Sequence, residues 1–358
     1  MSALAAVGYT VNGIGVAHEE GAKLSAITFE TKITVVKLFT RTLTFLPRTF
    51  RHGLSICELA IKMLPEVIRQ RPDIIHCHDT LALPLGIIAN ILFKNKLIYD
   101  AHELESNRNG LTKLQGKLTS FVENLAWRYI DALIVVSPSI DTWYKAKFGP
   151  KLSAVILNAP LFSDNYYQDS NYLRKLFKIP PHDKIFIYVG ILGRGRGIEL
   201  ITEAFIHHNI SAHAVFLGYG ELTEALKQLE IENSNIHVHE AVPHSQVVPI
   251  VQSADYGLCL IQNVSLSDYY CLPNKLFEYC FAGVPVLASD FPDIRIVLEK
   301  YNIGECCELN AETIRSSIRR LEGHDTQFQF ADLKPLSWQA QETKLVNLYQ
   351  SVQQATDN

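Results

Sequence analysis

The chain has 358 residues, of which 47% are hydrophobic and 20% are charged. One ordinary hydrophobic core does not extend over this length, so we expect a globular protein with two domains. The formal net charge of −4 argues against general nucleic-acid binding, which needs a basic surface. The seven cysteines contain no C-x-x-C pair, which is typical of reduced thiols and predicts a cytoplasmic protein.

Neither export nor membrane insertion is predicted. The N-terminal residues lack the basic and then apolar pattern of a signal peptide. The longest nearly uninterrupted apolar stretch, Leu81 to Phe93, is too short to cross a bilayer.

Short apolar runs alternate with helical patterns along nearly the whole chain. In the first part, the runs that predict strands are Tyr9–Val16, Ile74–His78, Leu97–Asp100, Ala132–Ser137 and Ala154–Leu157. In the second part, they are Lys184–Gly190, Ala214–Gly218, Asn235–His239, Tyr256–Ile261, Val284–Ala288 and Ile303–Cys306. Most are apolar along their length, as strands of parallel sheets are. This alternation predicts βαβ units and doubly wound α/β domains.

A polar segment with prolines, residues 158–181, separates the two sets of strands. We place the junction near Ala159-Pro160, with a first domain over residues 1–160 and a second over residues 161–336. Residues 337–358 contain a helical pattern that can pack on either domain, including by crossing back to the first.

Two features of the first part leave alternatives open. The span Lys32 to Arg71 has eight Lys or Arg and two Glu among several Phe, which fits either a surface lying on anionic lipid or an ordinary helix pair with a basic face. His76 and His78 alternate on a predicted strand and so point the same way, like two metal ligands. The sequence places no third ligand, and we favour a structural pair or the lining of a cleft.

The segment after the strand at 184–190 has the pattern of an anion-binding turn. Glycines at 190, 193, 195 and 197 are interleaved with Arg194 and Arg196, and helical spacing follows from Ile198. Glycine lets backbone N–H groups approach an anion, the helix N-terminus adds partial positive charge, and arginine can hold phosphate oxygens. The alternative is a plain strand-to-helix turn with solvated arginines.

A second segment, Leu272 to Asp290, reads as loop, helix, turn and strand. Pro273 suits a first helical turn, which puts Asn274 and Lys275 beside free N–H groups, with Glu278 one turn further on. An ordinary helix–strand unit with solvated charges is the alternative.

Together the two segments resemble the nucleotide-sugar half of a glycosyltransferase of family 4, in the subset with P-N-K-L-F-E-Y on the donor helix. Further matches along the chain are Asp73–Asp79, Tyr99–Glu103, Val135–Ser139, Leu157–Pro160, Gly218–Glu221, Val242–Gln246 and Ala254-Asp255. The resemblance implies the GT-B fold, two doubly wound Rossmann-like domains that face each other across a cleft. The first would bind the acceptor and the second the nucleotide sugar.

The resemblance also implies an activity: a retaining glycosyltransferase that moves a sugar from a UDP- or GDP-type sugar to a glycan or lipid-linked acceptor. A role in cell-surface polysaccharide assembly, at the inner face of the membrane, would follow. It assigns His102 to catalysis, Glu278 to the ribose and Val242 to the base. The implied diphosphate ligands are Arg194, Gly195, Arg196, Gly197, Asn274 and Lys275. Cationic side chains would replace a metal cofactor.

Two departures from the family keep other functions open. The first of a usual pair of glutamates falls on Tyr270. Because Met1 to Val16 resembles the end of the family's first helix and its second strand, we expect the family's first strand and its glycine-rich loop to be absent. We therefore also consider a truncated, catalytically inactive remnant that acts as a binding protein. Another GT-B enzyme, such as a nucleotide-sugar epimerase or a phosphorylase, is a third interpretation.

Overall fold

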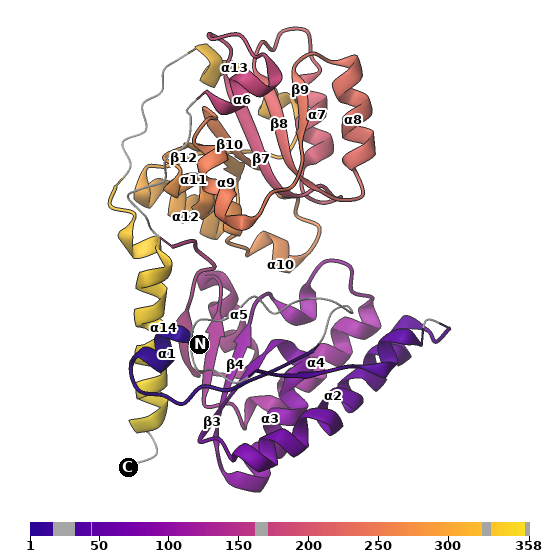
Figure 1. The fold of residues 1–358 in the computed structure, drawn as a ribbon, viewed down its shortest axis with the longest axis vertical. Helices are drawn as coiled ribbons and strands as arrows, with labels where there is room; N and C mark the ends of the chain where they lie inside the picture. Colours follow the sequence, from indigo (N-terminus) through magenta and orange to yellow (C-terminus); the bar gives the residue numbers. More distant parts are fainter. Residues whose placement is uncertain (17–32, 44, 162–170, 324–330, 355–358) are drawn as a thin grey trace. The chain divides into compact units, whose positions relative to one another are not determined.

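The computed structural model describes residues 1–16, 33–43, 45–161, 171–323 and 331–354. The chain divides into two compact units, whose elements are labelled in Figure 1. Unit 1 contains Met1–Ile156 and Gln341–Asn358, and unit 2 contains Leu157–Ala340. The division falls a few residues before Ala159-Pro160, and most of the last helix belongs to unit 1.

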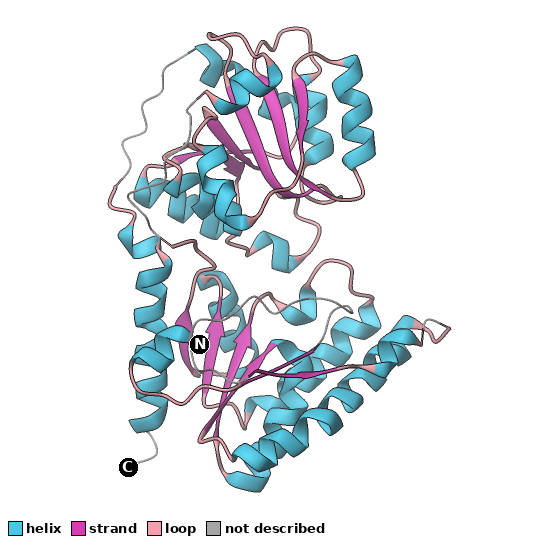
Figure 2. Ribbon diagram, viewed as in Figure 1, coloured by secondary structure: helices cyan, strands magenta, loops and turns pink. Residues whose placement is uncertain are grey.

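Unit 1 is built on a parallel four-stranded sheet with the order β3-β4-β5-β6 (Figure 2). The strands are β3 (Ile74–His78), β4 (Lys96–Ala101), β5 (Ala132–Val135) and β6 (Leu152–Val155). The elements between them are α3 (Asp79–Phe93), the 3-10 helix η2 (Glu105–Asn107), α4 (Lys113–Trp127) and α5 (Pro138–Phe148). All of β5, and all of β4 except Lys96, is buried, as expected for strands covered on both faces.

The other elements of unit 1 lie beside this sheet. They are α1 (Ser2–Ala6), the parallel strand pair β1 (Gly13–Val16) and β2 (Ile33–Val36), the 3-10 helix η1 (Phe39–Thr42), α2 (Arg48–Gln70) and α14 (Trp338–Gln354). In α2, Leu59, Met63 and Val67 recur every four residues and are buried in a cluster that includes Leu85 and Ala89 of α3. This apolar stripe holds the long helix against the unit.

Unit 2 has a parallel six-stranded sheet with the order β12-β11-β10-β7-β8-β9. The strands are β7 (Ile185–Ile191), β8 (His213–Tyr219), β9 (Ile236–His239), β10 (Tyr256–Cys259), β11 (Val286–Ser289) and β12 (Gly304–Cys307). The helices are α6 (Tyr172–Phe177), α7 (Ile198–Phe205), α8 (Thr223–Glu232), α9 (His244–Val251), α10 (Leu266–Tyr269), α11 (Asn274–Phe281), α12 (Pro292–Tyr301) and α13 (Ala311–Gly323), with the 3-10 helix η3 (Lys334–Leu336). The core includes Phe186, Phe205 and Phe216, all fully buried.

One buried tyrosine fixes α11 on the sheet. The Tyr279 hydroxyl donates to the Leu258 carbonyl at 3.1 Å and accepts from the Val189 N–H at 3.0 Å, so it bridges β10 and β7. A Cβ on Gly257 would lie 2.4 Å from the Tyr279 ring, so glycine leaves room for the ring. The side chains at the start of α11 are therefore held on a rigid support.

Each predicted strand is present, with ends shifted by up to four residues. The prediction missed β2, and its helix-pair interpretation of Lys32 to Arg71 is wrong: the described part of this span contains a strand, a 3-10 helix and one long helix. The run Ile33-Thr-Val-Val36 is β-branched throughout, which favours a strand.

Candidate active site

The turn after β7 has the backbone that its glycines predict. Gly195 and Gly197 both have φ of 78°, in the left-handed region that favours glycine. A Cβ on Gly197 would lie 1.8 Å from the Leu260 carbonyl oxygen, so the turn lies directly against the residue that follows β10. The turn thus brings its backbone to the carboxyl ends of the central strands, where α/β sheets bind ligands.

The two arginines of the turn have different surroundings. The Arg194 residue is exposed, and its backbone N–H donates to Glu221 Oε1 at 3.1 Å. Arg196 is half-buried, with Nη1 3.7 Å from Asp268 Oδ1. Asp268 is itself held by Ser265, whose hydroxyl donates to its Oδ2 at 2.6 Å. Arg196 is therefore the arginine positioned by the fold.

Lys275, in the first turn of α11, carries a buried charge. Its Nζ lies 3.6 Å from the centre of the Tyr188 ring, a cation–π contact. Among the residues that the structure describes, this buried Nζ has no hydrogen-bond partner. A Cβ on Gly190 would stand 3.7 Å from Nζ, so the glycine leaves space beside the ammonium. Burying an ammonium without an anion is costly, which makes this a place for an anionic ligand.

The positive charges of Lys275 and Arg196 both affect Cys259, the last residue of β10. Burial raises the pKa of the Cys259 thiol, at the end of β10, to about 11, and the positive charges of Lys275 and Arg196 both oppose this rise. Because charge effects weaken with distance, both cations lie near the end of β10. The fold therefore brings together cations that are 79 positions apart in the sequence.

Glu278 lies one turn beyond Lys275 and is buried. Burial raises its pKa, which the charges of His244 and Lys275 oppose. Its Oε1 is 3.8 Å from Nδ1 of His244, the exposed first residue of α9. Val242 is half-buried just before α9, and Asn274 is exposed at the start of α11. A buried carboxylate at such a place can accept hydrogen bonds from a pair of hydroxyl groups.

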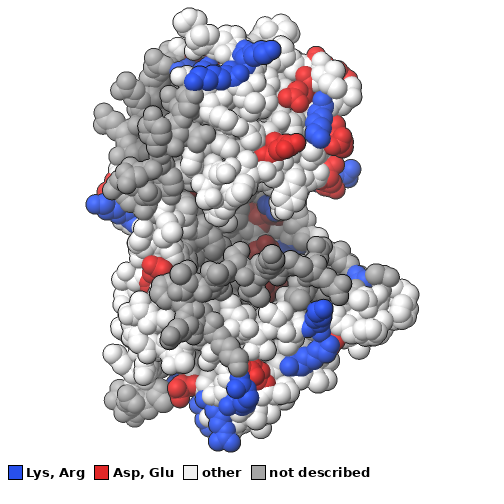
Figure 3. All heavy atoms as spheres, in the orientation of Figure 1, with Lys and Arg blue, Asp and Glu red and all other residues white. Residues whose placement is uncertain are grey.

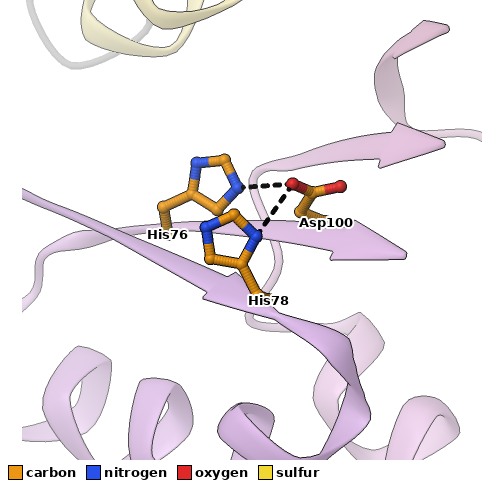
Figure 4. Close-up of side chains that lie close together, drawn as sticks. All are labelled: His76, His78 and Asp100. Atoms are coloured by element: carbon orange, nitrogen blue, oxygen red, sulfur yellow. Dashed lines mark hydrogen bonds and ion pairs between the residues drawn. The ribbon is translucent and has the colours of Figure 1, made fainter. Parts of the chain in front are cut away.

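His102 belongs to unit 1 and is part of a cluster of imidazoles around Asp100. Figure 4 shows His76 and His78 of β3 directed at one carboxylate oxygen of Asp100 on β4. His76 Nε2 and His78 Nδ1 lie 3.0 and 3.1 Å from Asp100 Oδ2. His102 Nε2 lies 2.9 Å from His78 Nδ1 and 3.5 Å from Asp100 Oδ2. The expectation that the two histidines of β3 point the same way is confirmed, because their rings stack with centroids 4.4 Å apart.

Asp100 is the charged centre of this cluster. Burial alone would raise its pKa, but hydrogen bonds from His76 and His78 outweigh burial and hold the pKa well below its usual range. Burial lowers the pKa of His76, against the effect of Asp100. The His76 Nδ1 shares a 2.7 Å hydrogen bond with the hydroxyl of Tyr349 in α14. The cluster is therefore an ionised carboxylate surrounded by three imidazoles.

Unit 1 also has a cavity with a carboxyl pair. Asp79, Glu105 and Arg108 line it, together with apolar residues that include Leu81 and Leu118. Glu105 is buried, its Oε1 has no hydrogen-bond partner among the described residues, and burial followed by the neighbouring Asp79 charge raises its pKa to about 8. Asp79 has φ of 61°, a strained value for a residue other than glycine. A protonated Glu105 can donate a hydrogen bond to a ligand in this cavity.

Several of these residues were not found from the sequence. Asp100 and Tyr349 complete the histidine cluster, and Tyr188 contacts Lys275. Only Asp100 had a usable signal, since it stands two residues before His102 in the matched segment Tyr99–Glu103. The contact of Tyr349 with a strand 273 positions away depends on where the last helix packs.

These features define an α/β protein with two Rossmann-like units and a cationic site at the carboxyl ends of the strands of unit 2. Residues 1–159 match the family model described as Glycosyltransferase Family 4, and residues 169–327 match the model described as Glycosyl transferases group 1. The chain therefore belongs to glycosyltransferase family 4 and is a glycosyltransferase with the GT-B fold. No curated protein matches the sequence.

Solved structures share the fold at low identity. Sucrose-phosphate synthase from Thermosynechococcus elongatus is 17% identical with a TM-score of 0.78, over 99% of this chain and 91% of that one. HepE from Anabaena, in complex with UDP, is 15% identical with a TM-score of 0.63, over 91% and 86%. The lipopolysaccharide outer core galactosyltransferase WaaB, in its apo form, is 15% identical with a TM-score of 0.61, over 90% and 85%.

The described surface carries charges of both signs. On the face drawn in Figure 3, Lys and Arg side chains lie in small groups, with groups of Asp and Glu elsewhere on the same face. Within the described ranges, we find no helix that combines the length and the apolar character of a membrane span.

Proposed function

We propose that the protein is a retaining glycosyltransferase that moves a sugar from a nucleoside diphosphate sugar to a hydroxyl group of a glycan or lipid-linked acceptor. The observation that carries the proposal is the buried ammonium of Lys275, which lacks a hydrogen-bond partner among the described residues and whose charge, like that of Arg196, acts on Cys259 at the end of β10. A diphosphate supplies the anion that this site lacks. The HepE structures hold UDP and UDP-glucose, which favours a uridine nucleotide.

The reaction breaks the bond between the sugar anomeric carbon and the diphosphate, and forms a bond from that carbon to the acceptor oxygen. The proton of the acceptor hydroxyl passes to the departing diphosphate. The departing diphosphate gains negative charge, so groups that bind it more tightly as this charge develops accelerate the step. We assign this role to Arg196 and Lys275, supported by Arg194, Asn274 and the N–H groups of the turn at Gly195 and Gly197. No divalent metal is needed in this scheme.

Other groups position the two substrates. Glu278 accepts hydrogen bonds from the ribose hydroxyls, and the backbone at Val242 contacts the base. In unit 1, His102 accepts a hydrogen bond from a substrate hydroxyl, and the cavity at Asp79 and Glu105 binds hydroxyl groups of the acceptor. WaaB acts on the lipopolysaccharide outer core, which favours a role in cell-surface polysaccharide assembly.

Calorimetric titration with UDP and GDP tests the donor site. We expect Arg196→Ala to weaken binding by about 1.5–3 kcal/mol, the usual worth of a hydrogen bond to a charged group. Lys275→Met should weaken it comparably while filling the same space. Lys227→Met, on the exposed side of α8, is the matched control and should leave affinity unchanged. Equal affinities in the parent and both site variants would contradict the proposal.

We also propose that unit 1 associates with the anionic inner face of the membrane. The side chains of Phe45 and Phe50 are 79% and 73% exposed around the start of α2, close in sequence to Arg51. Exposed aromatic rings beside cations suit the interface of an anionic bilayer.

Sedimentation with vesicles tests this surface. We expect the protein to pellet with vesicles that contain anionic lipid, less so at high salt, and Phe45→Ser with Phe50→Ser to remain in solution. Ile231→Ser, at an equally exposed position of α8, is the control. If the double variant binds the vesicles as the parent does, Phe45 and Phe50 do not form the membrane contact. A parent that does not pellet with anionic vesicles would contradict membrane association.

A further inference from the structure

We propose that His76, His78 and Asp100 form a binding site for a divalent transition-metal ion of the zinc type. The site lies in unit 1, at the carboxyl ends of β3 and β4 (Figure 4). Its three ligands all belong to unit 1, whereas the residues of the cationic donor site belong to unit 2 and use no metal in our scheme.

The spacing of the ligand atoms fits such an ion. His76 Nε2 and His78 Nδ1 lie 3.0 and 3.1 Å from Asp100 Oδ2, and one ligand atom from each residue lies within 4.8 Å of the other two. With metal–ligand bonds of about 2.0–2.2 Å, ligand atoms around tetrahedral zinc stand about 3.3–3.6 Å apart. Small side-chain rotations therefore make room for the ion.

The backbone positions the three ligands before any ion arrives. His78 pairs with Asp100 in the register of β3 and β4, and His76 pairs with Ile98. Ligands on paired strands are held more accurately than ligands on loops. The two imidazoles also stack, with an interplanar angle of 24°, which limits their rotation.

An outer contact supports His76 as a ligand. A histidine that binds a metal usually donates its other ring N–H to a nearby acceptor, which fixes the tautomer. The Tyr349 hydroxyl lies 2.7 Å from His76 Nδ1 and can accept this hydrogen bond, which would leave the lone pair of Nε2 for the ion when it binds. Tyr349 is buried and comes from α14, so the contact is built by the fold.

Access and donor type decide which ion fits. The His78 side chain is 62% exposed and that of His102 is 41% exposed, so an ion can reach the site. Water or His102 can supply a fourth ligand. Two or three imidazoles with one carboxylate suit Zn²⁺, whereas Mg²⁺ and Ca²⁺ prefer oxygen ligands.

A bound ion would have a predictable effect on turnover. The ion would bind His78 and could take the neighbouring His102 as its fourth ligand. We therefore expect Zn²⁺ to inhibit transfer and EDTA to leave turnover intact. This consequence rests on the role proposed above for His102. The binding test below does not, so the two proposals can fail separately.

The test is calorimetric titration of the chelator-treated full chain with Zn²⁺ alone, together with thermal unfolding. We expect one Zn²⁺ per chain and a higher unfolding midpoint with Zn²⁺. Tyr349→Phe should weaken binding by roughly 10–100-fold, the usual effect of removing an outer contact. His78→Ala should weaken it further, and its exposure makes unfolding of this variant a small risk.

His208→Ala, at an exposed position of unit 2, controls for adventitious binding by surface histidines. It should bind Zn²⁺ as the parent does. Absence of saturable binding by the parent would overturn the proposal. Unchanged binding by His78→Ala would overturn it as well, because the ion would then lie elsewhere, for example at a cysteine.

Discussion

At the scale of single residues, two charged side chains are buried, although bulk water would solvate their charges more favourably. The Lys275 ammonium is buried against the face of Tyr188, and the Asp100 carboxylate is buried among three imidazoles. Removing a charge from water is costly, and folding tolerates the cost only where the rest of the fold fixes the geometry. In both cases the charge lies at the carboxyl end of a parallel strand or next to it, where α/β proteins bind substrates.

The first prediction at this scale is that His102 serves the reaction and contributes little to folding. The preceding Ile98 and Tyr99 of β4 are fully buried and supply the packing, whereas the His102 side chain is partly exposed. His102→Ala should change the free energy of unfolding by no more than about 0.5 kcal/mol. Turnover should fall by roughly 100-fold or more, the usual effect of losing a group that accepts or donates a proton in the reaction.

Equilibrium unfolding in urea and steady-state turnover check this prediction. His182→Ala, at an exposed position of unit 2, serves as the control for the loss of an imidazole. A His102 variant that turns over at the parent rate would return this residue to a structural role.

At the scale of elements, two glycines separate the cost of backbone strain from the cost of a steric collision. Gly197 lies in the turn between β7 and α7, and Gly283 lies in the turn between α11 and β11. Gly197 and Gly283 both have left-handed backbones, with φ of 78° and 71°. A Cβ on Gly197 would collide with the Leu260 carbonyl, whereas one on Gly283 would meet nothing within 4 Å. Gly283→Ala should therefore cost only the left-handed strain, about 1–2 kcal/mol. Gly197→Ala should cost clearly more and should also weaken nucleotide binding.

Thermal unfolding of both variants and titration with UDP provide the measurements. Equal losses of stability would mean that the backbone at Gly197 has room to move, and the turn would then not be fixed by the contact with Leu260.

The elements were largely predictable from the sequence because parallel strands are buried on both sides. Runs such as Ala132–Val135 and Tyr256–Cys259 stand out as apolar segments bounded by polar residues. The sequence also predicted cations next to two helix starts, because glycines and cations there have a local physical meaning, and their role in binding stays a prediction. The contacts of Tyr188 and Tyr349 could not be anticipated, because they depend on how elements distant in sequence pack.

At the scale of the whole molecule, the two units hold buried titratable groups that shift in opposite senses. In unit 1, burial and the Asp79 charge raise the pKa of Glu105 to about 8. In unit 2, burial and the His213 charge lower the pKa of His237 to about 4. His237 shares a 2.9 Å hydrogen bond with His213, so the two stacked rings form one buried pair.

The last prediction follows from the proton balance of these groups. Unfolded Glu105 releases its proton near pH 4.5, whereas the folded group keeps it to about pH 8. Its contribution is complete below pH 4.5 and is lost as pH rises to about 8. Unfolded His237 takes up a proton near pH 6.5, whereas the folded group stays neutral down to about pH 4, so stability is lost as pH falls through this window. Urea unfolding between pH 4 and pH 9 measures both. Between pH 4.5 and 6.5 the two effects oppose each other. Glu105→Gln should therefore remove the loss of stability between pH 6.5 and 8 and leave a rise from pH 4 to 6.5, whereas His237→Gln should leave a continuous fall from pH 4.5 to 8. A parent-like slope in either variant would mean that the corresponding group is not buried in the protonation state argued here.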